Sequence, residues 1–137
     1  MNNTKKGFTL VELLVVIAIL AILATVSVVG YTSFIERANV SNAQTEAHQI
    51  KTVIESALIG VDYVIVDDTT GSTIYAQEVD GEVVFTATAP TVTGTPKTAD
   101  VSDDLATYLA KLSLVSGELH YAYSSDVTVD VLTGEKQ

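Results

Sequence analysis

The alternation of apolar and polar positions divides the chain into three parts. Residues 8–30 form a nearly unbroken apolar run, and its one charged residue is Glu12. As an α-helix this run of 23 residues would be about 34 Å long, which matches the roughly 30 Å apolar core of a bilayer. We therefore predict a membrane-spanning helix over residues 8–30.

A helical period continues after Gly30. Apolar residues recur there mostly at steps of three and four, namely at Tyr31, Phe34, Ile35, Ala38, Ala43, Ala47, Ile50, Ile54, Ala57 and Leu58. This predicts an amphipathic continuation over residues 31–60, ended by Gly60, where a left-handed backbone is easiest. The stretch from Thr25 to Gly30 contains β-branched residues but no proline, so we expect a continuous or mildly bent helix.

The period becomes strand-like over residues 61–137. Strand patterns cover residues 61–67, 73–79, 82–87, 118–124 and 126–133. Asp80-Gly81 predicts a hairpin, and residues 86–99, with six threonines and both prolines, predict an exposed loop. A short helix is expected to start at Asp100 or Ser102 and to end at Gly117. Together these patterns predict an α+β fold, in which a small antiparallel β-sheet head packs against the long N-terminal helix.

Charge indicates orientation and argues against one class of partner. The chain has 7 Lys and Arg residues against 17 Asp and Glu residues, a formal net charge of −10. So acidic a chain repels phosphate backbones, which argues against direct nucleic-acid binding. Lys5 and Lys6 precede the apolar run and the next basic residue is Arg37. The N-terminus is therefore expected to stay in the cytoplasm.

No set of residues predicts catalysis. His48 and His120 are the only histidines, there is no cysteine, and H-E-x-x-H and G-x-S-x-G are both absent. We predict no catalytic residue, no cofactor and no metal site, and therefore no enzyme. A cation near Asp67-Asp68, or near Asp100, Asp103 and Asp104, is the alternative, although neither stretch has the regular spacing of a calcium loop.

The start of the chain carries a specific motif. Lys5-Lys6-Gly7, followed by Phe8-Thr9-Leu10-Val11-Glu12 and the apolar run, resembles the class III signal of type IV prepilins and of the related pseudopilins. The resemblance covers residues 5–24. It implies that a prepilin peptidase removes the leader, residues 1–7, between Gly7 and Phe8, and that Phe8 is then N-methylated. It also implies that Glu12 pairs with the terminal amine of a neighbouring subunit during assembly.

The resemblance implies a structural subunit of a type IV pilus, used for adhesion, motility or a related role. Such a precursor waits in the cytoplasmic membrane and is then assembled into a helical homopolymer on the cell surface by an assembly ATPase and a platform protein. Removing Lys5 and Lys6 takes two positive charges from −10 and leaves −12 from side chains. Many Gram-negative pilins have a C-terminal disulfide, so the absence of cysteine predicts a Gram-positive source.

Two other functions stay open. A pseudopilin of a type II secretion system or of a competence pseudopilus shares the same signal, glutamate and long helix. A single-pass membrane-anchored binding module, with an ordinary signal or anchor sequence, is the alternative of another class, and Glu12 would then be incidental.

Overall fold

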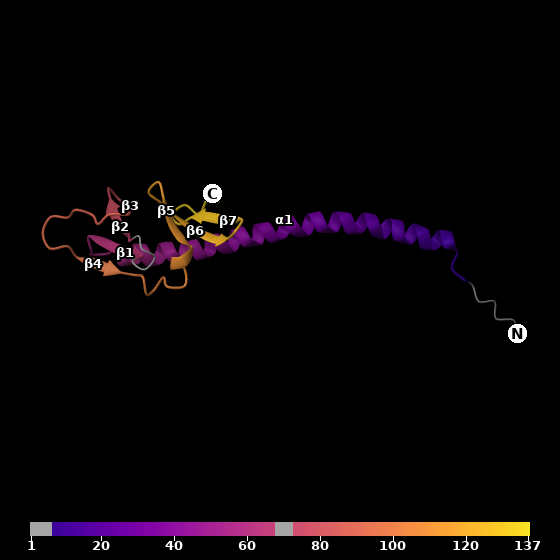
Figure 1. Cartoon of the computed structure of the whole chain (residues 1–137), viewed down its shortest axis with the longest axis horizontal. Coiled ribbons are helices and arrows are strands. Elements are labelled where there is room, and N and C mark those ends of the chain that lie inside the picture. Colours follow the sequence, from indigo (N-terminus) through magenta and orange to yellow (C-terminus); the bar gives the residue numbers. More distant parts are fainter. Residues whose placement is uncertain (1–6, 68–72) are drawn as a thin grey trace. The chain divides into compact units, whose positions relative to one another are not determined.

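The computed structural model describes residues 7–67 and 73–137, which fall into two compact units divided after Ala38. We call residues 39–137 the C-terminal unit and the preceding part the N-terminal unit. The elements, labelled in Figure 1, are α1 (Leu10–Ala57), β1 (Tyr63–Asp67), β2 (Ile74–Val79), β3 (Glu82–Thr86), β4 (Thr98–Asp100), the 3-10 helix η1 (Leu109–Lys111), β5 (Leu112–Val115), β6 (Glu118–Ser124) and β7 (Val127–Asp130). The predicted α+β class is confirmed.

The N-terminal unit consists of the first part of α1. Every described residue from 7 to 37 is exposed, and the large apolar side chains there include Leu13, Ile17, Leu20 and Leu23, which are 56–62% exposed. The most apolar 18-residue window of α1 has a mean hydropathy of 3.0 and none of it is buried. By length and composition, this segment can cross a membrane.

The helix continues past the stretch around Gly30, as predicted. The hydroxyl of Thr25 donates to the carbonyl of Ile22 at 2.7 Å, and that of Ser27 donates to the carbonyl of Leu23 at 2.8 Å. One turn later Thr32 and Ser33 both donate to the carbonyl oxygen of Val29. These contacts satisfy the hydroxyl groups within the helix itself, so they need no water.

The second part of α1 supplies one side of the core of the C-terminal unit. Ala43, Ala47, Ile50 and Ile54 are 0–1% exposed because their spacing of three and four places them on one helical face. The predicted apolar stripe is therefore buried only from Ala43 onward, and Tyr31, Phe34 and Ile35 of the N-terminal unit are exposed. The helix ends at Ala57, and Gly60 follows with a φ of 78°.

The strands form two sheets rather than the single antiparallel sheet that we predicted. The first has the order β3-β2-β1-β4 and the second the order β5-β6-β7. The Asp80-Gly81 hairpin between β2 and β3 is confirmed, and both residues have positive φ, at 54° and 86°. Strand β4 begins within the segment expected to be a loop, residues 86–99, and it pairs in parallel with β1.

The short helix predicted after Asp100 is wrong. Residues 102–108 form turns, η1 is a single 3-10 turn, and residues 112–115 form strand β5. An oxygen of the Asp100 side chain accepts the N–H of Ser102 at 2.9 Å, which closes a local turn. Leu105 and Leu109 still reach the core at 1% and 7% exposure. The antiparallel pairing of β5 with β6 outweighs the weak helix preference of this segment.

A polar contact joins α1 to β6 inside the C-terminal unit. Tyr121 is 0% exposed and its hydroxyl donates to a carboxylate oxygen of Glu46. The ring of Tyr108 packs edge-on against that of Tyr121, with 5.8 Å between the centroids, and Lys111 Nζ lies 5.7 Å from the Tyr121 centroid. Burial of Tyr121, together with the Glu46 carboxylate, raises the pKa of the phenol.

Candidate assembly site at the start of α1

The first turn of α1 is closed by a reciprocal pair of side chains. The backbone N–H of Thr9 donates to Glu12 Oε2 at 2.8 Å, and the Thr9 hydroxyl donates to the same oxygen at 3.0 Å. In return, the backbone N–H of Glu12 donates to Thr9 Oγ1 at 3.3 Å. The first N–H groups of a helix have no partner within the helix. This arrangement is a capping box, which satisfies two of them.

The sequence prediction for Glu12 missed this capping role. The signal was present, because Thr9-Leu10-Val11-Glu12 has the T-x-x-E spacing of a capping box in front of an apolar run. Both contacts from Thr9 go to Oε2. The other carboxylate oxygen, Oε1, accepts no hydrogen bond from the part of the chain that the structure describes, so it is open to a donor from outside.

Gly7 and Phe8 precede the helix and are accessible. Phe8 is 90% exposed, and a Cβ added to Gly7 would meet nothing within 4 Å. The peptide bond between them lies in a non-helical segment directly before the capping box. The rest of the predicted leader, including Lys5 and Lys6, lies outside the described residues.

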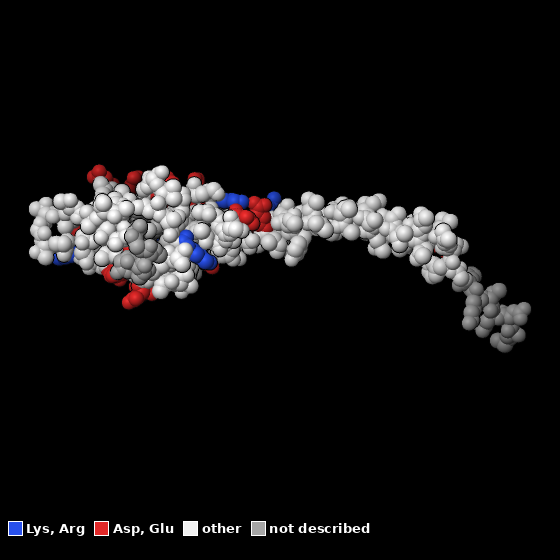
Figure 2. Space-filling view, viewed as in Figure 1, with Lys and Arg blue, Asp and Glu red and all other residues white. Residues whose placement is uncertain are grey.

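The residues that follow the capping box form an uncharged helical surface. No Asp, Glu, Lys or Arg occurs between Glu12 and Glu36, and in Figure 2 this stretch of α1 is white, whereas red carboxylate groups are scattered over the visible surface of the C-terminal unit. A surface of this kind is stable only against lipid or against other apolar helices.

The two histidines are far in sequence from the capping box, and they belong to different elements. His48 is an exposed residue of α1, and His120 is a partly buried residue of β6. Asp100, Asp103 and Asp104 do not form a cluster that could hold a metal within residues 7–67 and 73–137. The other predicted cation position includes Asp68, which lies outside the described residues.

Comparison with known proteins identifies the segment. A family model described as the prokaryotic N-terminal methylation motif matches residues 2–28, the stretch that contains Gly7, Phe8 and the capping box. The chain therefore carries a prokaryotic N-terminal methylation motif over these residues.

Two curated proteins are similar to part of this chain. A type IV major fimbrial protein FimA of Dichelobacter nodosus is 42% identical over 59 residues, which cover 43% of this chain and 38% of that protein. A fimbrial protein of Moraxella nonliquefaciens is 50% identical over 54 residues, which cover 39% of this chain and 35% of that protein. The chain thus spans less than two fifths of the length of these relatives. No solved structure matches this chain.

Proposed function

We propose that this chain is the precursor of a structural subunit of a type IV pilus. The observation that carries the proposal is the exposed, uncharged surface of α1 after Glu12, which begins within a methylation motif that matches residues 2–28. The subunit is processed between Gly7 and Phe8, is methylated at Phe8, and polymerises through its apolar helix. Its role is structural rather than catalytic.

The free energy of the apolar helix supports assembly directly from the membrane. Each large aliphatic side chain between Leu13 and Leu23 would forfeit roughly 1.5–3 kcal/mol if it left an apolar environment for water. Transfer from lipid into a core of neighbouring helices avoids this cost, because one apolar environment replaces another. Identical subunits that contact through different faces without closing a ring form an open helical fibre.

Glu12 supplies the register of the fibre in this proposal. A carboxylate without a partner is penalised inside an apolar core, and pairing with the Phe8 amine of a neighbour removes that penalty. Because Thr9 occupies only Oε2, Glu12 can close its own helix and still offer Oε1 to the neighbouring amine. Capping and assembly therefore use different oxygens of one side chain.

The partners and the location follow from the same proposal. The precursor lies in the cytoplasmic membrane with its N-terminus in the cytoplasm, and the polymer lies at the cell surface. A prepilin peptidase, an assembly ATPase and a platform protein are the partners, and the polymer is made of copies of this chain. A Gram-positive source stays a prediction from the absence of cysteine.

Substitution of Gly7 tests processing. A Cβ at Gly7 would meet nothing within 4 Å and Gly7 precedes the helix, so in Gly7→Phe the fold should persist while cleavage fails. We expect surface fibres with N-methylated Phe8 from the parent chain, and full-length precursor without fibres from the variant. N-terminal sequencing and mass spectrometry of sheared fibres provide the measurement. Fibres built from chains that retain Met1 would contradict the proposed processing. Parent chains that retain Met1 and form no fibres would favour the membrane-anchored module.

A pseudopilin is the second candidate, because it shares the motif and the long apolar helix. The names of the curated relatives favour the pilus, since both are fimbrial proteins. Fibre length separates the two candidates: long fibres at native expression levels indicate a pilus, and a short periplasmic or wall-spanning assembly indicates a pseudopilus.

A further inference from the structure

The hairpin of β6 and β7 brings together three side chains that metals bind. Glu118 and His120 are two residues apart on β6, so they lie on the same face of the strand. His120 is the cross-strand partner of Asp130 on β7. One ligand atom from each of Glu118, His120 and Asp130 lies within 4.8 Å of those from the other two. Across the described residues, this is the only such group.

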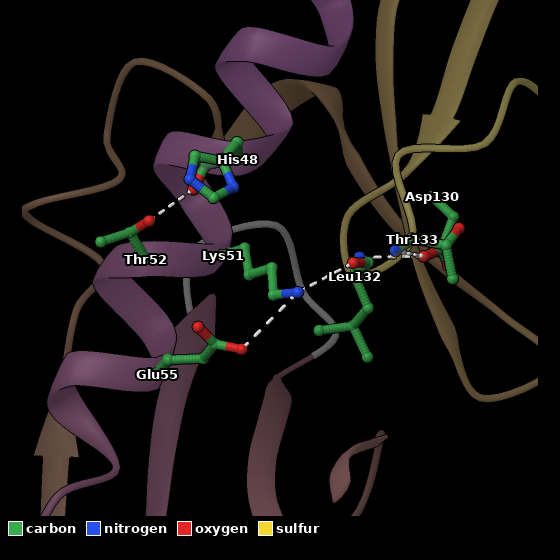
Figure 3. A network of polar contacts seen from close by, with 7 residues as sticks. All are labelled: His48, Lys51, Thr52, Glu55, Asp130, Leu132 and Thr133. Carbon is green, nitrogen blue, oxygen red and sulfur yellow. Dashed lines mark hydrogen bonds and ion pairs between the residues drawn. The ribbon is translucent and has the colours of Figure 1, made fainter.

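Asp130 is the fixed member of this group. It is 4% exposed, and its Oδ1 accepts the N–H of Leu132 at 2.9 Å and the N–H of Thr133 at 2.7 Å. Figure 3 shows both contacts, with the second carboxylate oxygen outside them. Both of these hydrogen bonds use Oδ1, and neither uses Oδ2. A buried carboxylate is thus held in place with one oxygen left for a ligand.

The ammonium group of Lys51, drawn in Figure 3, contacts groups other than the Asp130 carboxylate. Lys51 Nζ donates to the carbonyl oxygen of Leu132 at 3.1 Å and lies 3.8 Å from a carboxylate oxygen of Glu55. Its charge is therefore directed at α1 and at the backbone rather than at the Asp130 carboxylate. A divalent cation would supply positive charge where two carboxylates converge.

The distance between Glu118 and His120, and the exposure of the glutamate side chain, suit a metal site. His120 Nε2 lies 3.3 Å from Glu118 Oε2, close to the roughly 3.4 Å between ligands in a tetrahedral zinc site with metal–ligand bonds of about 2.1 Å. The side chain of His120 is 12% exposed and that of Glu118 is 63% exposed. The imidazole is thus held by packing, whereas the glutamate can rotate to close on an ion.

We propose that Glu118, His120 and Asp130 form a zinc site of the C-terminal unit. One imidazole and two carboxylates favour Zn²⁺ over Ca²⁺ or Mg²⁺, which prefer oxygen ligands alone. Three protein ligands leave the fourth position to water or to a ligand from another molecule. The site is independent of the proposed filament role, since all three residues lie outside the apolar helix.

The ion would connect β6 to the turn that follows β7. Asp130 organises this turn, since its N–H donates to the carbonyl of Glu135 and its carbonyl accepts the N–H of Gly134, both at 2.9 Å. Because the chain has no cysteine, a bound metal ion would cross-link these segments where a disulfide cannot. An ion that binds the folded state and not the unfolded one raises the stability of that state.

The test uses the full chain in detergent micelles, without a histidine tag, after treatment with a chelator. Calorimetric titration with ZnCl2 should show one Zn²⁺ per chain, and the thermal transition of the near-ultraviolet circular dichroism should move to higher temperature as zinc is added. Excess CaCl2 should not displace the zinc. Displacement by calcium, or no binding by the parent chain, would overturn the proposal.

Matched histidine variants assign the site. His120→Gln removes a proposed metal ligand. Loss of a residue that only supports a ligand weakens metal binding roughly 10- to 100-fold, so His120→Gln should weaken Zn²⁺ binding by more than that. His48→Gln should bind Zn²⁺ as the parent does. Glu118→Gln is the second ligand variant. Because the Glu118 side chain is exposed, this change should not affect folding, and it should also weaken Zn²⁺ binding. Equal binding by His120→Gln and the parent, or loss of binding with His48→Gln, would refute the assignment.

Discussion

Glu12 has two roles at the scale of the single residue. The structure assigns it to the capping box with Thr9, and the proposed function assigns it to the amine of a neighbouring subunit. The two roles can be separated because they depend on different atoms. Thr9→Val removes the hydroxyl contacts but keeps the carboxylate, whereas Glu12→Ala removes the carboxylate itself.

We expect Glu12→Ala to insert in the membrane and to reduce the yield of sheared fibres by at least about tenfold, since the Phe8 amine would lose its partner in an apolar core. Thr9→Val should cost about 1 kcal/mol of helix capping and leave the fibre yield close to that of the parent. Glu82→Ala, at an exposed position of β3, controls for loss of any acidic residue. An equal loss of fibres in the Thr9 and Glu12 variants would assign Glu12 to capping alone.

Tyr121 predicts a pH dependence of stability. Burial raises the pKa of this phenol, so the folded state holds the proton more tightly than the unfolded state, in which tyrosine ionises near pH 10. The protonated phenol therefore contributes its full stabilisation below pH 10, and this contribution falls as the pH rises above 10. At pH 11 the free energy of unfolding should be lower by about 1.4 kcal/mol.

Denaturation of the full chain in micelles at pH 8 and pH 11 measures this effect. Tyr121→Phe should lose less stability than the parent between these pH values, although it is less stable at pH 8 because Glu46 loses a donor. Tyr75→Phe, at a partly exposed position of β2, is the control. Identical losses in the parent and in Tyr121→Phe would show that the buried phenol is not responsible.

At the scale of the element, α1 is continuous but contains a weak stretch. Residues 25–33 combine β-branched residues, hydroxyl groups that bond to preceding carbonyls, and Gly30. Each of these features lowers helix stability or permits a bend. Because a Cβ at Gly30 would meet nothing within 4 Å, Gly30→Ala adds helix propensity without a clash.

We expect Gly30→Ala to stabilise this stretch by about 1 kcal/mol, which corresponds to about fivefold slower amide hydrogen exchange where local opening limits exchange. Mass spectrometry of peptic fragments from the chain in micelles can measure it. The comparison is with Gly60→Ala, which should destabilise because Gly60 has a φ of 78°. Unchanged exchange around residue 30 in Gly30→Ala would show that the glycine does not weaken the helix.

The second part of α1 sets the stability of the C-terminal unit. Ile54 is 1% exposed and Ile59 is 81% exposed, so the same substitution at the two positions isolates the effect of burial. Ile54→Asp should destabilise the unit by at least about 4 kcal/mol, through lost apolar burial and an unpaired buried charge. Ile59→Asp should change the midpoint of denaturation little. Equal midpoints for the two variants would contradict the observed packing.

Local sequence signals predicted those elements whose structure depends on local residues. The apolar run, the helical period from Ala43 to Ile54 and the Asp80-Gly81 turn each specify their own conformation, and β6 was predicted at its observed bounds. Strand β4 has only three residues and exists because β1 pairs with it. Strand β5 likewise depends on pairing with β6. Such pairings, and hence the division into two sheets, cannot be read from a local period.

The same distinction applies to the candidate site. Gly7, Phe8 and Glu12 were predicted because they form a contiguous motif, and the capping box could have been found from its T-x-x-E spacing. The cluster of Glu118, His120 and Asp130 could not, because it depends on the register of β6 against β7 and on the turn that buries Asp130.

At the scale of the whole molecule, the proposed fibre depends on an apolar helix joined to an acidic C-terminal unit. Electron microscopy of sheared surface material, labelled with an antibody against residues 39–137, should show fibres decorated along their whole length. A strain that lacks this chain is the control. Label at the fibre tips alone would indicate a minor subunit, and label confined to the membrane would contradict the structural role.

The position of the proposed cleavage decides what happens to the capping box. Cleavage after Gly7 leaves the amide of Thr9 unchanged, so maturation does not require the helix start to refold. A cut one bond later would convert that amide to a charged amine 2.8 Å from the carboxylate of its own chain. The carboxylate would then be neutralised by the amine of its own chain, so Oε1 could still accept a hydrogen bond but would offer the neighbouring amine no net negative charge.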